Sequence, residues 1–248
     1  MRVSVKSLIL ACSLMIITAM GNVTYAQQPK VIFPDPTMNF GRVPQMVTLT
    51  HTFWIKSMSV DTIKIVNVFP GCGCTEVPIE DSVIAPGDSL PISITFHSQR
   101  FRGFTKKEPT IRLDAVDRLM ALTLATYVMG ADEDYGALSI MPPGIDVSQF
   151  GTLPRRIGKC FVVNNTDQDL ELEVTDSTMK PFEIKIPEKI KAGETAEVKI
   201  RVKEDKVDQD LEESFTIRAV GINDGVYSIP VTRLYRPDSP VKSGSSKK

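Results

Sequence analysis

The cysteines and histidines beyond residue 26 are the residues whose types and spacing could do chemistry. Cys72 and Cys74 are two residues apart, so in an extended backbone their side chains would lie on the same face. Two thiolates on one face suit a soft ion such as Cu(I) or Zn(II). A closed zinc site needs four ligands, and we expect His51 to face the core or its rim while His97 points outward. We therefore assign no metal site, and Cys72 and Cys74 are the candidate ligands if one exists.

The same cysteines have other uses that do not involve a metal. A disulfide between Cys72 and Cys74 would close a tight, strained ring that is more redox-active than structural. Pairing either of them with Cys160 would join two parts of the chain, and three cysteines leave at least one unpaired. Alternatively, Gly71 and Gly73 permit a sharp turn with the small thiols packed beneath it. A structural turn, a thiol or disulfide site and a soft-metal site all remain open.

Motifs of catalysis and of nucleotide binding are absent from the sequence. There is no G-x-S-x-G, no H-E-x-x-H and no glycine-rich phosphate loop. The formal net charge is −1, with 29 Lys and Arg against 30 Asp and Glu, which argues against a nucleic-acid partner. We interpret Asp132 to Asp134 as a solvated linker. The sequence thus predicts no catalytic residue, no cofactor and no enzyme activity.

The first 26 residues have the features of a secretory signal peptide. Arg2 and Lys6 precede an apolar run from Leu8 to Met20, and Ala26 ends a suitable cleavage site. The run is short for a membrane span, and no second long apolar segment follows. We expect an exported protein of the periplasm or cell surface, soluble or peripherally attached, with no transmembrane segment in the mature chain.

An internal repeat predicts the architecture. Three landmarks recur in the same order, at offsets of 110, 108 and 106 residues: Phe40-Gly41-Arg42-Val43-Pro44 with Phe150-Gly151-Thr152-Leu153-Pro154, Phe53-Trp54-Ile55-Lys56-Ser57 with Phe161-Val162-Val163-Asn164-Asn165, and Ala85-Pro86-Gly87-Asp88 with Lys191-Ala192-Gly193-Glu194. Within each copy apolar residues alternate with polar ones, which indicates antiparallel sheets with one buried face. About 100 residues per copy suits an immunoglobulin-like (Ig-like) sandwich.

The fold class that follows is all-β, with two tandem Ig-like β-sandwich domains after the signal peptide. The predicted divisions are residues 1–26 for the signal peptide, 27–131 and 136–236 for the two domains, and 237–248 for a disordered tail rich in Pro, Ser, Gly and Lys.

The segment from Leu119 to Met129 is apolar on both faces of its predicted strand. Such a strand is either covered on both sides, here by the second copy, or awaits a strand from another protein by β-augmentation. The candidate interaction strand comprises Leu119, Leu122, Leu124, Tyr127 and Met129.

The first copy resembles a bacterial family of unknown function, the domain of unknown function 1573, which is related to Ig-like domains of the ASH/Hydin type. The residues that carry the resemblance are Phe40-Gly41, His51-Thr52-Phe53-Trp54-Ile55-Lys56, Gly71-Cys72-Gly73-Cys74-Thr75 and Ala85-Pro86-Gly87-Asp88. The Cys-Gly-Cys-Thr turn is the specific part, and the second copy lacks it. The resemblance implies an exported, non-enzymatic Ig-like module of the kind found in envelope proteins of Bacteroidetes-type bacteria.

Three functional hypotheses follow. The leading one is a protein-binding or scaffolding module whose partner is another envelope protein. The second is a periplasmic chaperone with two Ig-like domains, although no basic cleft for a client carboxylate can be assigned. The third is a thiol redox or soft-metal protein that uses Cys72 and Cys74.

Overall fold

The computed structural model describes residues 30–79, 81–130, 133, 135–176 and 180–238. The described residues form β-strands and one 3₁₀ helix, and none of their helices is long and apolar enough to cross a membrane. The strands are β1 Val31–Ile32, β2 Thr37–Pro44, β3 Thr48–Ser57, β4 Ile63–Phe69, β5 Thr75–Glu76, β6 Val83–Ile84, β7 Ser89–His97, β8 Gly103–Lys107, β9 Thr110–Leu113, β10 Met120–Ala121, β11 Thr123–Met129, β12 Leu138–Met141, β13 Ile145–Asp146, β14 Gln149–Phe150, β15 Ile157–Asn164, β16 Leu170–Asp176, β17 Phe182–Lys185, β18 Lys189–Ile190, β19 Thr195–Val202, β20 Leu211–Ala219, β21 Val226–Arg233 and β22 Tyr235–Arg236, with the 3₁₀ helix η1 at Glu204–Lys206.

Two separate hydrophobic clusters organise the molecule. The N-terminal unit encloses the first, which runs from Val31 to Val128, between the sheet β1-β3-β7-β5 and the sheet β10-β9-β4-β6. The C-terminal unit encloses the second, from Leu138 to Val231, between the sheet β12-β15-β19-β17 and the strands β16, β20 and β21. The alternating apolar positions of these strands supply both clusters, so the predicted all-β, Ig-like fold class is confirmed.

The sequence repeat corresponds to repeated local structure. Gly87 (φ +73°) and Gly193 (φ +70°) both adopt the left-handed conformation in the turn before a long strand. The residue after each glycine closes the turn, with Asp88 N–H donating to Ala85 and Glu194 N–H donating to Lys191. The two turns are therefore the same element in each unit, built where only glycine adopts the backbone without strain.

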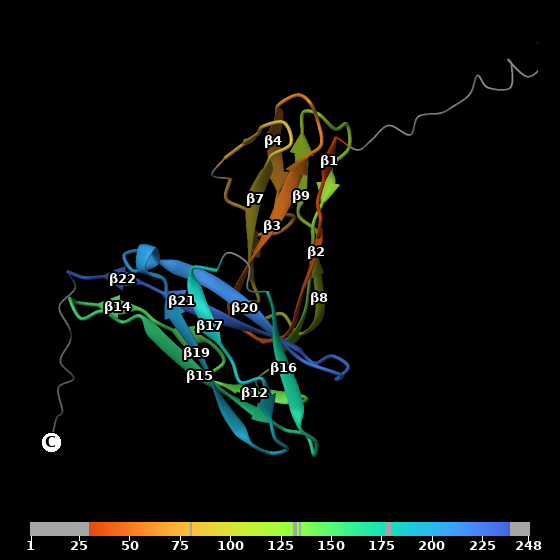
Figure 1. Cartoon of the computed structure of the whole chain (residues 1–248). Helices are drawn as coiled ribbons and strands as arrows, with labels where there is room; N and C mark the ends of the chain where they lie inside the picture. Colours follow the sequence, from red (N-terminus) through yellow and green to blue (C-terminus); the bar gives the residue numbers. More distant parts are fainter. Residues whose placement is uncertain (1–29, 80, 131–132, 134, 177–179, 239–248) are drawn as a thin grey trace, which may run out of the picture.

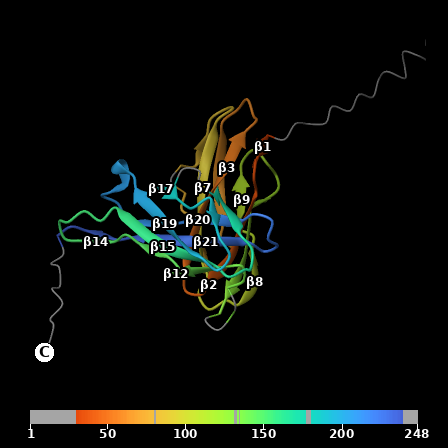
Figure 2. The ribbon, with the colours of Figure 1, turned by 60° about the horizontal axis from the view of Figure 1, so that its bottom comes forward.

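One sheet crosses from one unit to the other. Its order is β18-β16-β20-β21-β2-β11-β8, so β21 of the C-terminal unit is bordered by β2 of the N-terminal unit, with Arg42 opposite Tyr227. Figures 1 and 2 show the N-terminal unit meeting the C-terminal unit at strands β20 and β21. Gly41 makes this crossing possible, because a Cβ there would lie 2.0 Å from the Val226 carbonyl oxygen.

Strand β11 differs from the predicted interaction strand. It pairs in parallel with β2 and antiparallel with β8, so both of its edges are occupied. Leu122, Leu124 and Met129 are buried, whereas Leu119 and Tyr127 are partly exposed. β-augmentation on this strand is therefore wrong. One partner, β2, lies more than 80 residues earlier in the sequence, and the free edge belongs to the other partner, β8.

Candidate functional site

The Cys-Gly-Cys turn contains a disulfide between Cys72 and Cys74. The backbone there is a turn and not an extended strand, closed by the Thr75 N–H, which donates to the Cys72 carbonyl at 3.4 Å. Cys74 is buried in the N-terminal cluster, while Cys72 is only partly buried. No group of three or more His, Cys, Asp or Glu within the described part of the chain is arranged to hold a metal.

Cys160 does not join the units. It is fully buried in the C-terminal cluster and unpaired, which excludes the pairing with Cys72 or Cys74. Burial raises the pKa of its thiol to about 12.

Alkylation should separate Cys72 from the buried Cys160. After reduction of the folded chain, we expect an alkylated Cys72 but an unmodified Cys160, because the Cys160 thiol is both buried and protonated. In denaturant all three should react. Mass spectrometry counts the adducts, and rapid labelling of Cys160 in the folded chain would contradict its placement.

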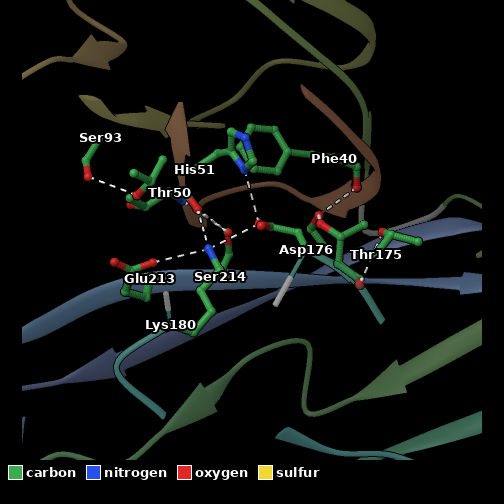
Figure 3. Close-up of polar contacts among 12 residues, drawn as sticks. Phe40, Thr50, His51, Ser93, Thr175, Asp176, Lys180, Glu213 and Ser214 are labelled. Atoms are coloured by element: carbon green, nitrogen blue, oxygen red, sulfur yellow. Dashed lines mark hydrogen bonds and ion pairs between the residues drawn. The ribbon is translucent and has the colours of Figure 1, made fainter. Parts of the chain in front are cut away.

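The junction between the units holds a cluster of buried and partly buried ionisable groups (Figure 3). Lys180 Nζ lies 3.1 Å from Asp176 Oδ2 and 3.4 Å from Glu213 Oε2. His51 Nδ1 lies 3.2 Å from the same Asp176 oxygen. We call His51, Asp176, Lys180 and Glu213 the junction cluster.

Hydrogen bonds to strand β3 surround the junction cluster. The Thr50 carbonyl accepts from Ser214 Oγ (3.0 Å) and from Lys180 Nζ (3.3 Å). The Thr50 hydroxyl donates to the Glu212 carbonyl at 2.8 Å. Polar groups of β3 are thus satisfied by the C-terminal unit, which fixes how the units meet.

A bulge in β16 aims Asp176 at this junction. The register of β16 against β20 shifts between Val174 and Asp176, so Val174 lies opposite Ile217 of the core and Asp176 lies opposite Thr216. Such a bulge moves the following side chain to the other face of the sheet. That face is the one that meets the N-terminal unit.

The charges in the junction cluster shift one another's protonation. Burial acts to raise the pKa of Asp176. The hydrogen bonds and positive charge of His51 and Lys180 outweigh this effect of burial and hold the pKa below its ordinary value. Burial raises the pKa of Glu213 above its ordinary value, against the opposing effect of Lys180. Lys180, 4% exposed, is thus already occupied by two carboxylates. This arrangement disfavours Lys180 as the anchor for a chaperone client's carboxylate.

Glu213 should leave a measurable pH dependence. Because its pKa is raised in the folded state, its contribution to stability is present at low pH and is lost as pH rises through the folded pKa. Asp176 has the opposite sign, since its contribution is lost as pH falls through its lowered pKa.

We therefore expect the unfolding free energy of the wild type, relative to Glu213→Gln, to increase by about 1 kcal/mol or less from pH 7 to pH 5. Urea unfolding at both pH values measures this difference. Glu212→Gln changes the exposed neighbouring residue and should follow the wild type. An identical pH dependence in Glu213→Gln and the wild type would contradict the assignment.

A row of aromatic and basic side chains crosses the sheet beside the junction. Phe104 on β8 lies opposite Tyr127 on β11, and Tyr127 lies opposite Arg42 on β2. The Arg42 guanidinium lies 5.1 Å from the centre of the Tyr127 ring, in a cation–π contact. Phe104 is 71% exposed and Tyr127 is 39% exposed. We call Phe104, Tyr127 and Arg42 the aromatic row.

A pocket of about 320 Å³ adjoins the aromatic row, and Asn39 and Asp224 also line it. Strand β8 is the last strand of its sheet and is bordered only by β11 among the described residues. Its backbone therefore offers a free edge next to exposed aromatic side chains. Such an arrangement can accept an extended segment through main-chain hydrogen bonds and hold a side chain in the pocket.

Sequence reasoning placed some of these residues and missed others. It placed His51 at the rim of the core and His97 outward, where the structure has His97 Nε2 3.1 Å from Glu76. It missed Asp176 and Lys180. Hydroxyl side chains alternate with core residues in β20 and β21, namely Ser214, Thr216 and Ser228. This pattern was the available signal that a second, polar face of these strands is buried.

Comparisons with known proteins give a family match over the N-terminal unit and distant structural likenesses over more of the chain. No curated protein matches the chain. A protein of unknown function from Porphyromonas gingivalis W83 is similar at 9% identity, TM-score 0.35, covering 83% of this chain and 99% of that one. An ASH/PapD-like domain of human CEP192 is similar at 12% identity, TM-score 0.33, covering 45% and 98%. The YadV chaperone is similar at 11% identity, TM-score 0.30, covering 82% and 98%.

At these scores the structural likenesses say nothing about what this chain binds. The family model is more specific, because it matches residues 31–128 and so spans the Cys-Gly-Cys turn, the aromatic row and strand β8. The model of the family described as "Protein of unknown function (DUF1573)" matches residues 31–128.

Proposed function

We propose that this chain is an exported, non-enzymatic module of the bacterial cell envelope that binds or scaffolds another envelope protein. In this proposal, residues 27–131 and 136–236 are two Ig-like domains. The observation that carries it is the exposed aromatic row beside the free edge of β8. Tyr and Arg are the residues that most often dominate binding energy in protein interfaces.

The partner contributes an extended segment that pairs with β8. The β8 strand carries Lys106, which pairs with Glu108 at 2.8 Å, and Lys107, and it has no acidic residue. A segment with acidic side chains complements Lys107. Lysines on an edge strand also discourage pairing with a second, equally basic copy of this chain. The junction cluster supports the scaffolding part of the proposal, because it holds the two units in one arrangement.

Crosslinking in the native envelope tests this function. We expect the wild type to capture a specific protein and Phe104→Ser to capture at least tenfold less of it. Raised salt should reduce the amount captured. Val60→Ser is the matched control. Val60 is 89% exposed and follows the C-terminal end of β3, away from Thr50 and the junction cluster. Equal capture by both variants, or no protein above background, would contradict the proposal.

A further inference from the structure

The Cys72–Cys74 disulfide is poorly placed to stabilise the fold. The two residues are separated by two positions in the sequence, and a disulfide stabilises mainly by restricting the unfolded chain, the more so the longer the loop it closes. The turn is also held without it, since the His97 N–H donates to the Cys74 carbonyl at 2.9 Å and Thr75 pairs with Phe96. A structural staple would add little here.

The two cysteines differ in exposure. Cys74 is 4% exposed and lies within the N-terminal cluster, whereas Cys72 is partly exposed and packs against that cluster. Thiol–disulfide exchange begins with a thiolate attacking an accessible sulfur atom. An incoming thiolate can therefore reach Cys72 and not Cys74.

Hydrogen-bond donors surround this disulfide. The Cys74 N–H lies 3.3 Å from Cys72 Sγ. The Thr75 hydroxyl oxygen lies 3.4 Å from Cys72 Sγ and 3.9 Å from Cys74 Sγ. Both donors can stabilise a thiolate formed when the bond opens. Stabilising the reduced form makes a disulfide a stronger oxidant.

We propose that Cys72 and Cys74 form a redox couple that oxidises dithiols of other proteins stoichiometrically. A partner thiolate attacks Cys72 Sγ, the Cys72–Cys74 bond breaks, and the electron pair stays on Cys74 Sγ beside the Thr75 hydroxyl. The partner's second thiolate then attacks the partner sulfur of the mixed disulfide and releases Cys72 as a thiolate. The partner loses two electrons and two protons, and the cysteine pair gains two electrons and takes up protons from water. This activity goes beyond the proposed binding function and does not rest on it.

Equilibration of the oxidised mature chain with a synthetic peptide that carries two cysteine thiols tests the couple. We expect the peptide to be oxidised and the pair Cys72 and Cys74 to be reduced. Thr75→Val should lower the equilibrium constant about tenfold, equivalent to roughly 30 mV, because the hydroxyl donor is lost. Thr75→Ser keeps the hydroxyl and should retain the wild-type value. Equal constants for all three chains, or no peptide oxidation, would overturn the proposal.

Single-cysteine variants test which sulfur reacts. With the oxidised form of the same peptide, Cys74→Ser should form a mixed disulfide through Cys72 at least tenfold faster than Cys72→Ser forms one through Cys74. Equal rates would overturn the assignment of Cys72. The wild type supplies a second measurement in case a variant fails to fold. Cooperative unfolding of the wild type, followed by the fluorescence of Trp54, should persist after the Cys72–Cys74 disulfide is reduced. Loss of that transition would show that the disulfide is needed for the fold.

Discussion

Replacing Gly41 with alanine is expected to lower the free energy of unfolding by about 3 kcal/mol or more. Gly41 has φ +64°, where a Cβ clashes with the local backbone, and here that Cβ would also collide with the backbone and side chain of Val226. The collision falls where β2 meets β21, so the strand pairing between the units should be lost. Urea unfolding followed by Trp54 fluorescence measures the change.

Gly87→Ala is the matched control for this variant. Gly87 has nearly the same conformation, φ +73°, but open space where a Cβ would be placed. Alanine there should cost only the conformational strain, about 1–2 kcal/mol. Equal losses in the two variants would show that β2 and β21 do not approach as closely as described.

Replacing Lys180 with methionine is expected to lower the free energy of unfolding by about 3 kcal/mol at pH 7. The change leaves the buried Asp176 and the partly buried Glu213 without their lysine. Asp176 and Glu213 both lie within 3.4 Å of Lys180 Nζ. The loss should be smaller at pH 5, since Glu213, with its raised pKa, takes up a proton. Urea unfolding at both pH values measures it.

Two further variants isolate the junction cluster from general effects of losing a charge. Lys159→Met removes an exposed lysine that pairs with Glu197 and should cost no more than about 1 kcal/mol. Asp176→Asn combined with Lys180→Met should cost less than the sum of the single variants, because the pair is coupled. Additive losses, or an equal cost for Lys159→Met, would contradict a buried ionic junction.

The fold could be predicted largely from local patterns. Alternation of apolar residues, as in Ile92, Ile94 and Phe96, directly reports a strand with one buried face. The glycine turns at Gly87 and Gly193 follow from a conformation that glycine adopts freely. Both signals lie within a few residues, so a single sequence contains them.

The neighbours of each strand and the junction could not be predicted in this way. β11 pairs with β2, which lies more than 80 residues earlier, and no local pattern records such a partner. The aspartate at 176 faces the junction only because the strand bulges beside it. In sequence, Lys180 is indistinguishable from a surface lysine, since its burial depends on carboxylates that the fold brings from β16 and β20.

The candidate site likewise has one part that the local sequence reveals and one part that depends on distant strands. The Cys-Gly-Cys turn is visible in the sequence because cysteines and glycines are conspicuous at short spacing. The aromatic row is not, since Phe104, Tyr127 and Arg42 come from three strands whose register brings them together. Tyr127 was among the predicted interaction residues, but the exposed edge beside it belongs to another strand.

Hydrogen exchange on the complex of this chain with the protein captured by crosslinking tests whether the free edge of β8 accepts a strand. We predict that the amides of β8, residues 103–107, exchange at least tenfold more slowly in the complex than in the free chain, because the added strand pairs with them. The amides of β1 and β5, at the edges of another sheet, should exchange at unchanged rates. Protection confined to another surface, with β8 unaffected, would contradict binding at this edge.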